Sequence, residues 1–173
     1  MRRVVVFGTT GSGKSWLAEK LAERHNLRLI ELDALFWGRD WQPAPLDLFR
    51  HRVEREIRDG DWIVVGNYGQ VRDLTWRAAD TLIWLDLPFP LVMWRLLWRT
   101  LGRIRSRRDL WGTGNRESFR NAFLSRDSIL LWAMKTHRRN RHRFAVECQF
   151  LGGDKTVVRL QDKAAVERFL QAA

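Results

Sequence analysis

The residues best suited to chemistry lie near the N-terminus, in the run Gly8-Thr9-Thr10-Gly11-Ser12-Gly13-Lys14-Ser15. This run fits the pattern G-x-x-x-x-G-K-[ST] at every fixed position. Glycines let a backbone fold tightly around an anion with its N–H groups pointing inward, and a helix starting there adds its positive dipole end. The lysine of such a run can reach β- and γ-phosphates, and the serine can ligate Mg²⁺. The run therefore indicates a phosphate-binding loop for which ATP and Mg²⁺ are the expected ligands.

The sequence on either side of this loop supports the same interpretation. Val4-Val5-Val6-Phe7 is typical of a buried parallel strand, and Ser15 to Asn26 has apolar residues at helical spacing. A strand before the loop and a helix after it are the context that the motif requires. Lys14 is the expected catalytic cation and Ser15 an expected metal ligand. The nucleotide is expected to bind to Gly8, Thr10, Gly11, Ser12, Gly13, Lys14, Ser15 and Trp16.

Carboxylates follow two further predicted strands. Asp33 comes after Leu29-Ile30-Glu31-Leu32, and Asp86 comes after Thr81-Leu82-Ile83-Trp84-Leu85. In open α/β sheets, ligands bind at the carboxyl ends of the strands, where a carboxylate can hold a metal-bound water or orient a substrate hydroxyl. Both aspartates are therefore candidate metal ligands. Asp33 is also a candidate catalytic residue, because the apolar and aromatic residues around it could form a pocket for the acceptor. Each aspartate could instead cap the turn or helix that follows it.

Positive charge is concentrated in residues 94–143, which contain 14 Lys and Arg against three acidic residues. The whole chain has a net charge of +11, so the remainder is neutral. Arg95, Arg99 and Arg103 are four residues apart and share one helix face. A basic lid formed around the loop at 102–115 could neutralise phosphates and exclude water. The alternatives are a solvated basic surface or, with the tryptophans of this segment, a surface for nucleic acid.

Strands alternate with helices along the chain, which predicts an α/β fold with three layers and a parallel sheet. The length of 173 residues favours a single domain, 1–173. The stretch that follows Asp33, through Pro43 and Pro45, is expected to be a loop. Besides the segments above, we expect strands at 62–65 and 156–160 and helices at 46–58, 90–101, 116–141 and, capped by Asp162, up to 170.

With these residues placed, nearly the whole chain resembles the adenylate-kinase-like P-loop proteins of the FlaR type, called DNA topology modulation proteins. The resemblance rests on the phosphate-binding loop and on four further runs. They are Leu32-Asp33-Ala34-Leu35-Phe36-Trp37, Trp62-Ile63-Val64-Val65-Gly66-Asn67-Tyr68, Ala79-Asp80-Thr81-Leu82-Ile83-Trp84-Leu85-Asp86 and, similar to actinobacterial adenylate-kinase-like members, Arg116-Glu117-Ser118-Phe119-Arg120-Asn121.

This resemblance implies a nucleoside-kinase fold with a five-stranded parallel sheet, an acceptor-site helical region at about 34–60 and a lid at about 102–116. It implies that Asp33 faces the acceptor, that Arg99 and Arg107 clamp phosphates, and that Gln161 lies near the adenine. One residue departs from the family, because relatives commonly have Asp where this chain has Val65. Either Asp33 or Asp86 then substitutes at the metal, or metal binding is weak and turnover slow.

Composition excludes several classes of protein. A single cysteine, Cys148, excludes an internal disulfide framework and a cysteine-rich zinc site. No run resembles a signal peptide or a membrane span, so a soluble cytoplasmic protein is expected.

Three functions fit these observations. The first is a kinase that moves the γ-phosphate of ATP to a small acceptor such as AMP or another nucleoside monophosphate. The second is an ATP-binding regulator associated with nucleic acid, and the third is a nucleotide-binding protein without turnover. The sequence indicates no oligomeric state.

Overall fold

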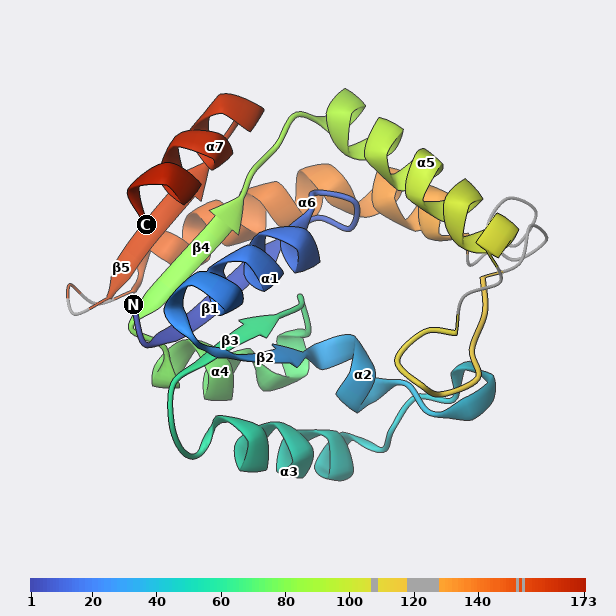
Figure 1. Cartoon of the computed structure of the whole chain (residues 1–173), viewed down its shortest axis with the longest axis horizontal. Coiled ribbons are helices and arrows are strands. Elements are labelled where there is room, and N and C mark those ends of the chain that lie inside the picture. Colours follow the sequence, from blue (N-terminus) through green and yellow to red (C-terminus); the bar gives the residue numbers. More distant parts are fainter. Residues whose placement is uncertain (107–108, 118–127, 152, 154) are drawn as a thin grey trace.

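The protein is an α/β molecule built on one parallel sheet (Figure 1). The computed structural model describes residues 1–106, 109–117, 128–151, 153 and 155–173. The strand order is β2-β3-β1-β4-β5, and all pairs are parallel. This confirms the predicted five-stranded parallel sheet. The strands are β1 (Arg3–Gly8), β2 (Arg28–Glu31), β3 (Trp62–Val65), β4 (Thr81–Leu85) and β5 (Thr156–Leu160).

Helices cover both faces of the sheet and give the three layers expected from the sequence (Figure 1). None of the helices in the described ranges is both long and apolar enough to span a membrane. The helices are α1 (Lys14–His25), α2 (Leu32–Phe36), η1 (Arg39–Trp41), α3 (Leu46–Ile57), η2 (Gly69–Val71), α4 (Arg72–Ala78), α5 (Phe89–Ser106), α6 (Ile129–Gln149) and α7 (Lys163–Ala172).

The core has two halves because successive residues of a strand point to opposite faces of the sheet. In β1, Val5 and Phe7 pack with α3, α4 and α6, whereas Val4 and Val6 pack with α1, α5 and α7. All four side chains are fully buried. Apolar residues on both faces are typical of central parallel strands, and they hold β1 and the loop after it at the centre of the molecule.

The helices differ from the sequence prediction mainly around the basic segment. Helix α5 continues through Gly102 to Ser106, because one exposed glycine costs a helix only about 1 kcal/mol. The helix expected at 116–141 was placed wrongly at both ends. Residues 116–117 are not helical, and α6 extends from Ile129 to Gln149. Helix α2 within the expected loop, and α4, were not predicted, because both are too short to show a clear period.

The start of the phosphate-binding loop is fixed by a side chain from the neighbouring strand. Strands β1 and β3 pair in parallel, with Val6 opposite Val65. Two residues beyond β3, the Asn67 side chain accepts a hydrogen bond from Gly8 N at 3.1 Å and donates one to Gly8 O. Gly8 is buried, so these bonds satisfy backbone groups that water cannot reach. Asn67 therefore ties the end of β3 to the first residue of the loop.

Replacing Asn67 with alanine should destabilise the protein. The variant Asn67→Ala leaves Gly8 N–H and C=O without partners, which costs about 1–3 kcal/mol for a buried polar group. Urea unfolding followed by circular dichroism measures this loss. The control is Gln70→Ala, which truncates an exposed side chain in the next turn. Equal unfolding midpoints for both variants would show that the Asn67 contacts contribute nothing.

Candidate active site

The phosphate-binding loop connects β1 to α1. Gly11 and Gly13 have φ angles of +82° and +94°, a region that side chains rarely adopt. Gly13 is the N-cap of α1, and its cap position carries no side-chain hydrogen bond. The first N–H groups of α1 are therefore available to an anion, and the helix dipole favours negative charge at this end. This geometry agrees with the cradle that the sequence motif predicts.

Helix α5 lies directly against the loop. A Cβ atom added to Gly11 would lie 2.8 Å from Val92 O and 2.9 Å from Leu96 Cβ, which is closer than real Cβ atoms approach. Only glycine therefore permits this contact. The helix brings Arg95 to the loop, where its Nη1 donates a hydrogen bond to Ser12 O at 3.3 Å. One face of α5 thus presents arginines to the phosphate cradle.

The Lys14 side chain folds back onto the backbone of the phosphate-binding loop. Its Nζ donates a hydrogen bond to Thr9 O at 3.1 Å. Burial of the ammonium group lowers the pKa of Lys14 to about 8. The carboxylate of Asp33 acts in the opposite direction and raises this pKa, whereas Arg99 lowers it. Asp33 and Arg99 are therefore the charged groups that interact with Lys14.

Arg99 is a second, partly buried cation close to Lys14. Its pKa is lowered to about 10, mainly by burial and also by the charge of Arg103, while Glu117 and Asp33 act in the opposite direction. The Arg99 Nε atom is buried and has no hydrogen-bond partner within the described residues, and the same holds for Ser12 Oγ. Buried polar atoms are normally paired, and an unpaired one calls for an explanation. A phosphate bound between the loop and α5 would supply the missing acceptor.

Asp33 lies in the first turn of α2, directly after β2. Its Oδ1 accepts a hydrogen bond from the Tyr68 hydroxyl at 2.5 Å. Burial and the neighbouring carboxylate of Asp33 raise the pKa of Tyr68 far above its usual value, so the phenol stays protonated. Tyr68 follows β3, the strand that pairs with β2. The carboxyl ends of two adjacent strands thus bring these groups together.

Asp86 has a different environment from Asp33. Its carboxylate is almost fully buried and forms ion pairs with Arg141, at 2.9 Å from Nε to Oδ1, and with Arg159, at 2.5 Å from Nη2 to Oδ2. Arg141 lies on α6 and Arg159 on β5, so the pairs join these elements to the end of β4. Both oxygens of Asp86 already bind guanidinium groups, which compete with a metal ion. Its assignment as a metal ligand stays a prediction.

Residues 109–117, which belong to the predicted lid, contact η1 and Gly38 in the predicted acceptor region. Residues 109–117 form a short hairpin closed by an antiparallel bridge between Leu110 and Asn115. The Asn115 side chain is buried; it donates to Gly38 O at 2.7 Å and accepts from Trp41 N at 3.0 Å. Nearby, Trp111 Nε1 donates to Glu31 Oε2 at 2.9 Å.

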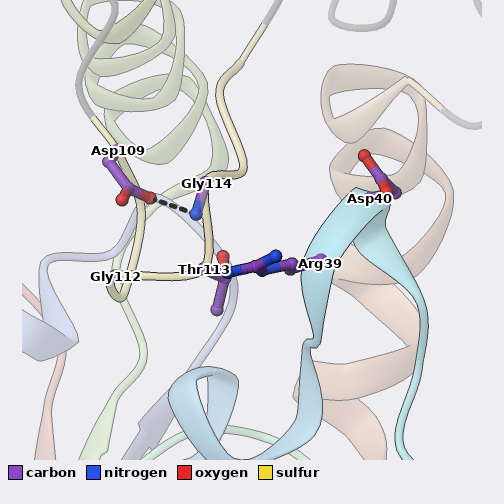
Figure 2. A pocket seen from close by; sticks show the side chains of 6 residues that line it. All are labelled: Arg39, Asp40, Asp109, Gly112, Thr113 and Gly114. Carbon is purple, nitrogen blue, oxygen red and sulfur yellow. Dashed lines mark hydrogen bonds between the residues drawn. The ribbon is translucent and has the colours of Figure 1, made fainter.

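A shallow pocket marks this junction in Figure 2, and none of its residues belongs to the phosphate-binding loop. Its lining includes Asp109, whose Oδ1 accepts a hydrogen bond from Gly114 N at 2.9 Å, and Arg39 on the facing segment. The pocket therefore lies between the hairpin and η1.

Comparison with solved structures identifies the fold. A sugar kinase from Janibacter sp. HTCC2649 superposes with a TM-score of 0.51 at 19% identity over 99% of this chain and 93% of that one. A gluconokinase from Sinorhizobium meliloti 1021 gives 0.52 at 18% over 99% and 94%. A shikimate kinase from Bacteroides thetaiotaomicron gives 0.55 at 15% over 99% and 95%. The chain has a nucleoside-kinase-like P-loop fold.

At this level of identity the comparisons establish the kinase-like fold alone. No protein-family model matches the chain, and no curated protein sequence matches it. The narrower resemblance to the FlaR-type proteins therefore stays a prediction.

The kinase-like fold brings only part of the predicted site residues together. Lys14, Asp33 and Arg99 interact with one another, as described above. Ser15 and Trp16 are exposed in the first turn of α1, and Gln161 is exposed directly after β5. Arg107, which was predicted to clamp phosphate, lies outside the described residues. The assigned roles of all these residues stay predictions.

Tyr68 and Arg95 contact this site but were not among the predicted site residues. The four-residue spacing from Arg95 to Arg99 already placed both on one helix face. No such signal exists for Tyr68, because its contact with Asp33 joins residues 35 positions apart. Val65 is a buried core residue, and the effect of its presence on metal binding stays a prediction.

The lowered pKa of Lys14 predicts a pH-dependent affinity for ATP. As the pH rises through about 8, the free protein loses the ammonium charge that attracts phosphate. The affinity for Mg·ATP should be nearly constant around neutral pH and fall by up to about tenfold per pH unit above about 8. Isothermal titration calorimetry measures this profile. Lys14→Met should bind weakly at every pH, and a wild-type affinity that stays constant to pH ~10 would contradict the assignment.

Proposed function

We propose that this protein is an ATP-dependent phosphotransferase that moves the γ-phosphoryl group of ATP to a small acceptor. One observation carries the proposal, namely that Lys14 and Arg99, both partly buried, interact with Asp33 at the start of α1. Two cations in a site shielded from water are suited to a phosphoryl group, whose charge must be stabilised during transfer. A carboxylate beside them can accept a hydrogen bond from a hydroxyl group of the acceptor. The kinase-like fold supports the same interpretation.

Each group of the phosphate-binding loop and of α5 has its own role in this proposal. Backbone N–H groups from Gly11 to Ser15 bind the β- and γ-phosphates, and Lys14 and Arg99 hold the γ-phosphoryl group from two sides. Arg95 steadies the loop through Ser12 O. Such catalysis consists mostly of positioning and electrostatic stabilisation.

Mg²⁺ would be held by the Ser15 hydroxyl together with phosphate oxygens, where it neutralises phosphate charge. Within the described residues no three His, Cys, Asp or Glu side chains gather in a metal-binding group. A magnesium ion of this kind does not need such a group, because it keeps several waters and few protein ligands.

The acceptor is expected beside Asp33, between α2 and the hairpin at 109–117. A carboxylate accepts a hydrogen bond from a hydroxyl group and repels an anionic phosphate. Asp33 therefore favours a small hydroxyl-bearing acceptor, as do solved structures named as sugar, gluconate and shikimate kinases. The family resemblance favours the other acceptor, a nucleoside monophosphate such as AMP. Both classes belong in the same assay.

Asp33→Asn tests the role of the carboxylate. It should lower acceptor-dependent ADP formation by about 10²–10⁴-fold, the range typical of a lost general base, while Mg·ATP still binds. A coupled assay with AMP, other nucleoside monophosphates, sugars, sugar acids and shikimate measures turnover, and calorimetry measures binding. The matched control is Asp59→Asn in an exposed turn, which should leave both unchanged.

Two results of this assay would contradict the proposal. Tight Mg·ATP binding without turnover for any acceptor would indicate a nucleotide-binding protein that lacks catalysis. Failure to bind Mg·ATP would remove the proposal altogether.

A second candidate function is an ATP-binding regulator associated with nucleic acid. Trp94 and Trp98 on α5 are 61% and 56% exposed, and their rings meet edge to face at 5.3 Å. Exposed Trp132, Arg138 and Arg139 on α6 add aromatic and basic groups. Aromatic rings stack on bases, and basic residues bind the phosphate backbone.

Salt dependence tests this second function. The logarithm of the affinity for nucleic acid should fall linearly with the logarithm of the salt concentration. The double variant Trp94→Ala/Trp98→Ala should bind more weakly than the wild type at each salt concentration. Fluorescence anisotropy with a labelled oligonucleotide measures both effects. Absence of binding at low salt would exclude this function.

A further inference from the structure

Tyr68 is the single tyrosine of the chain, and its ring is fixed by packing. The ring centroid lies 4.7 Å from that of Phe36 on α2 and 5.2 Å from that of Phe49 on α3. Its backbone is fixed as well, because the preceding residue, Asn67, bonds to both backbone groups of Gly8. The Tyr68 hydroxyl therefore has a set position relative to the phosphate-binding loop.

That hydroxyl controls the direction of the Asp33 carboxylate. It donates to Oδ1 at 2.5 Å, whereas Oδ2 has no hydrogen-bond partner among the described residues. A carboxylate held by one oxygen cannot rotate freely, so the direction of the other oxygen is fixed. The attraction between Asp33 and Lys14 places this carboxylate next to the phosphate-binding loop.

We propose that Tyr68 is a positioning residue that holds Asp33 by Oδ1 so that Oδ2 faces the acceptor hydroxyl. This inference rests on the proposed function. During transfer, the acceptor oxygen bonds to the γ-phosphorus while the bond from that phosphorus to the β–γ bridging oxygen breaks. ADP leaves with the electron pair, and the hydroxyl proton passes to Asp33 Oδ2. Tyr68 touches neither substrate.

Tyr68 acts as a hydrogen-bond donor in this arrangement and not as a base. Burial and the nearby Asp33 raise its pKa far above the usual value, so the phenol keeps its proton at physiological pH. A purely structural tyrosine would need only its ring, which contacts Phe36 and Phe49. Tyr68→Phe separates the two roles, because it keeps the ring and removes the hydroxyl.

A spectroscopic experiment tests the contact without any substrate. Protein labelled with ¹³C at tyrosine Cζ gives one NMR signal, since the chain has one tyrosine. Asp33→Asn should shift the signal at neutral pH, whereas Asp59→Asn should not. An unchanged signal in Asp33→Asn would overturn the proposal.

A kinetic double-mutant cycle tests the role. ADP release from Mg·ATP is measured with the most active compound of the acceptor panel. Tyr68→Phe should lower kcat about tenfold and change the KM for Mg·ATP by less than about twofold, because it misdirects one hydrogen bond without removing a phosphate contact. In the Asp33→Asn background, Tyr68→Phe should have no further effect.

Other kinetic outcomes overturn the inference. An unchanged kcat in Tyr68→Phe, or an equal loss in both backgrounds, would show that Tyr68 does not act through Asp33. Absence of turnover with every acceptor would remove the proposed function and this inference with it. An active kinase whose tyrosine signal is the same in the wild type and in Asp33→Asn would remove the inference alone.

Discussion

Helix α5 can lie on the phosphate-binding loop only because Gly11 has no side chain, and the candidate site depends on this contact. A Cβ atom there would lie within 2.9 Å of both Val92 O and Leu96 Cβ. One turn further along the same helix, Arg99 lies beside Lys14 and Asp33. Without the close approach, the loop could still bind an anion through its backbone, but the second cation would be lost.

The burial of two cations in one site has a thermodynamic cost. Lys14 and Arg99 both have lowered pKa values, mainly because their charged groups are removed from water. Asp33 opposes this effect for both, so its carboxylate stabilises the charged forms of Lys14 and Arg99. Such arrangements are typical of functional sites, where stability is lost in return for preorganised charge. Tyr68 fits this pattern, since its hydroxyl bonds to the one carboxylate that both cations share.

Local sequence patterns predicted the features that depend on neighbouring residues. The phosphate-binding loop followed from the spacing of Gly8, Gly13 and Lys14, and the strands followed from runs such as Trp62–Val65. Contacts between distant residues were not predictable from one sequence. Asp86 binds arginines 55 and 73 positions away, and Asn115 bonds to the backbone of Trp41, 74 positions away. The contact between Tyr68 and Asp33, 35 positions apart, is of this second kind as well.

A crystal structure with Mg²⁺ and a non-hydrolysable ATP analogue tests the central claim most directly. The β- and γ-phosphate oxygens should lie about 3 Å from the backbone nitrogens between Gly11 and Ser15. Lys14 Nζ should leave Thr9 O for the γ-phosphate, and Arg99 should contact the same group from α5. A nucleotide bound elsewhere, or a Lys14 that stays on Thr9 O beside an empty loop, would contradict the account.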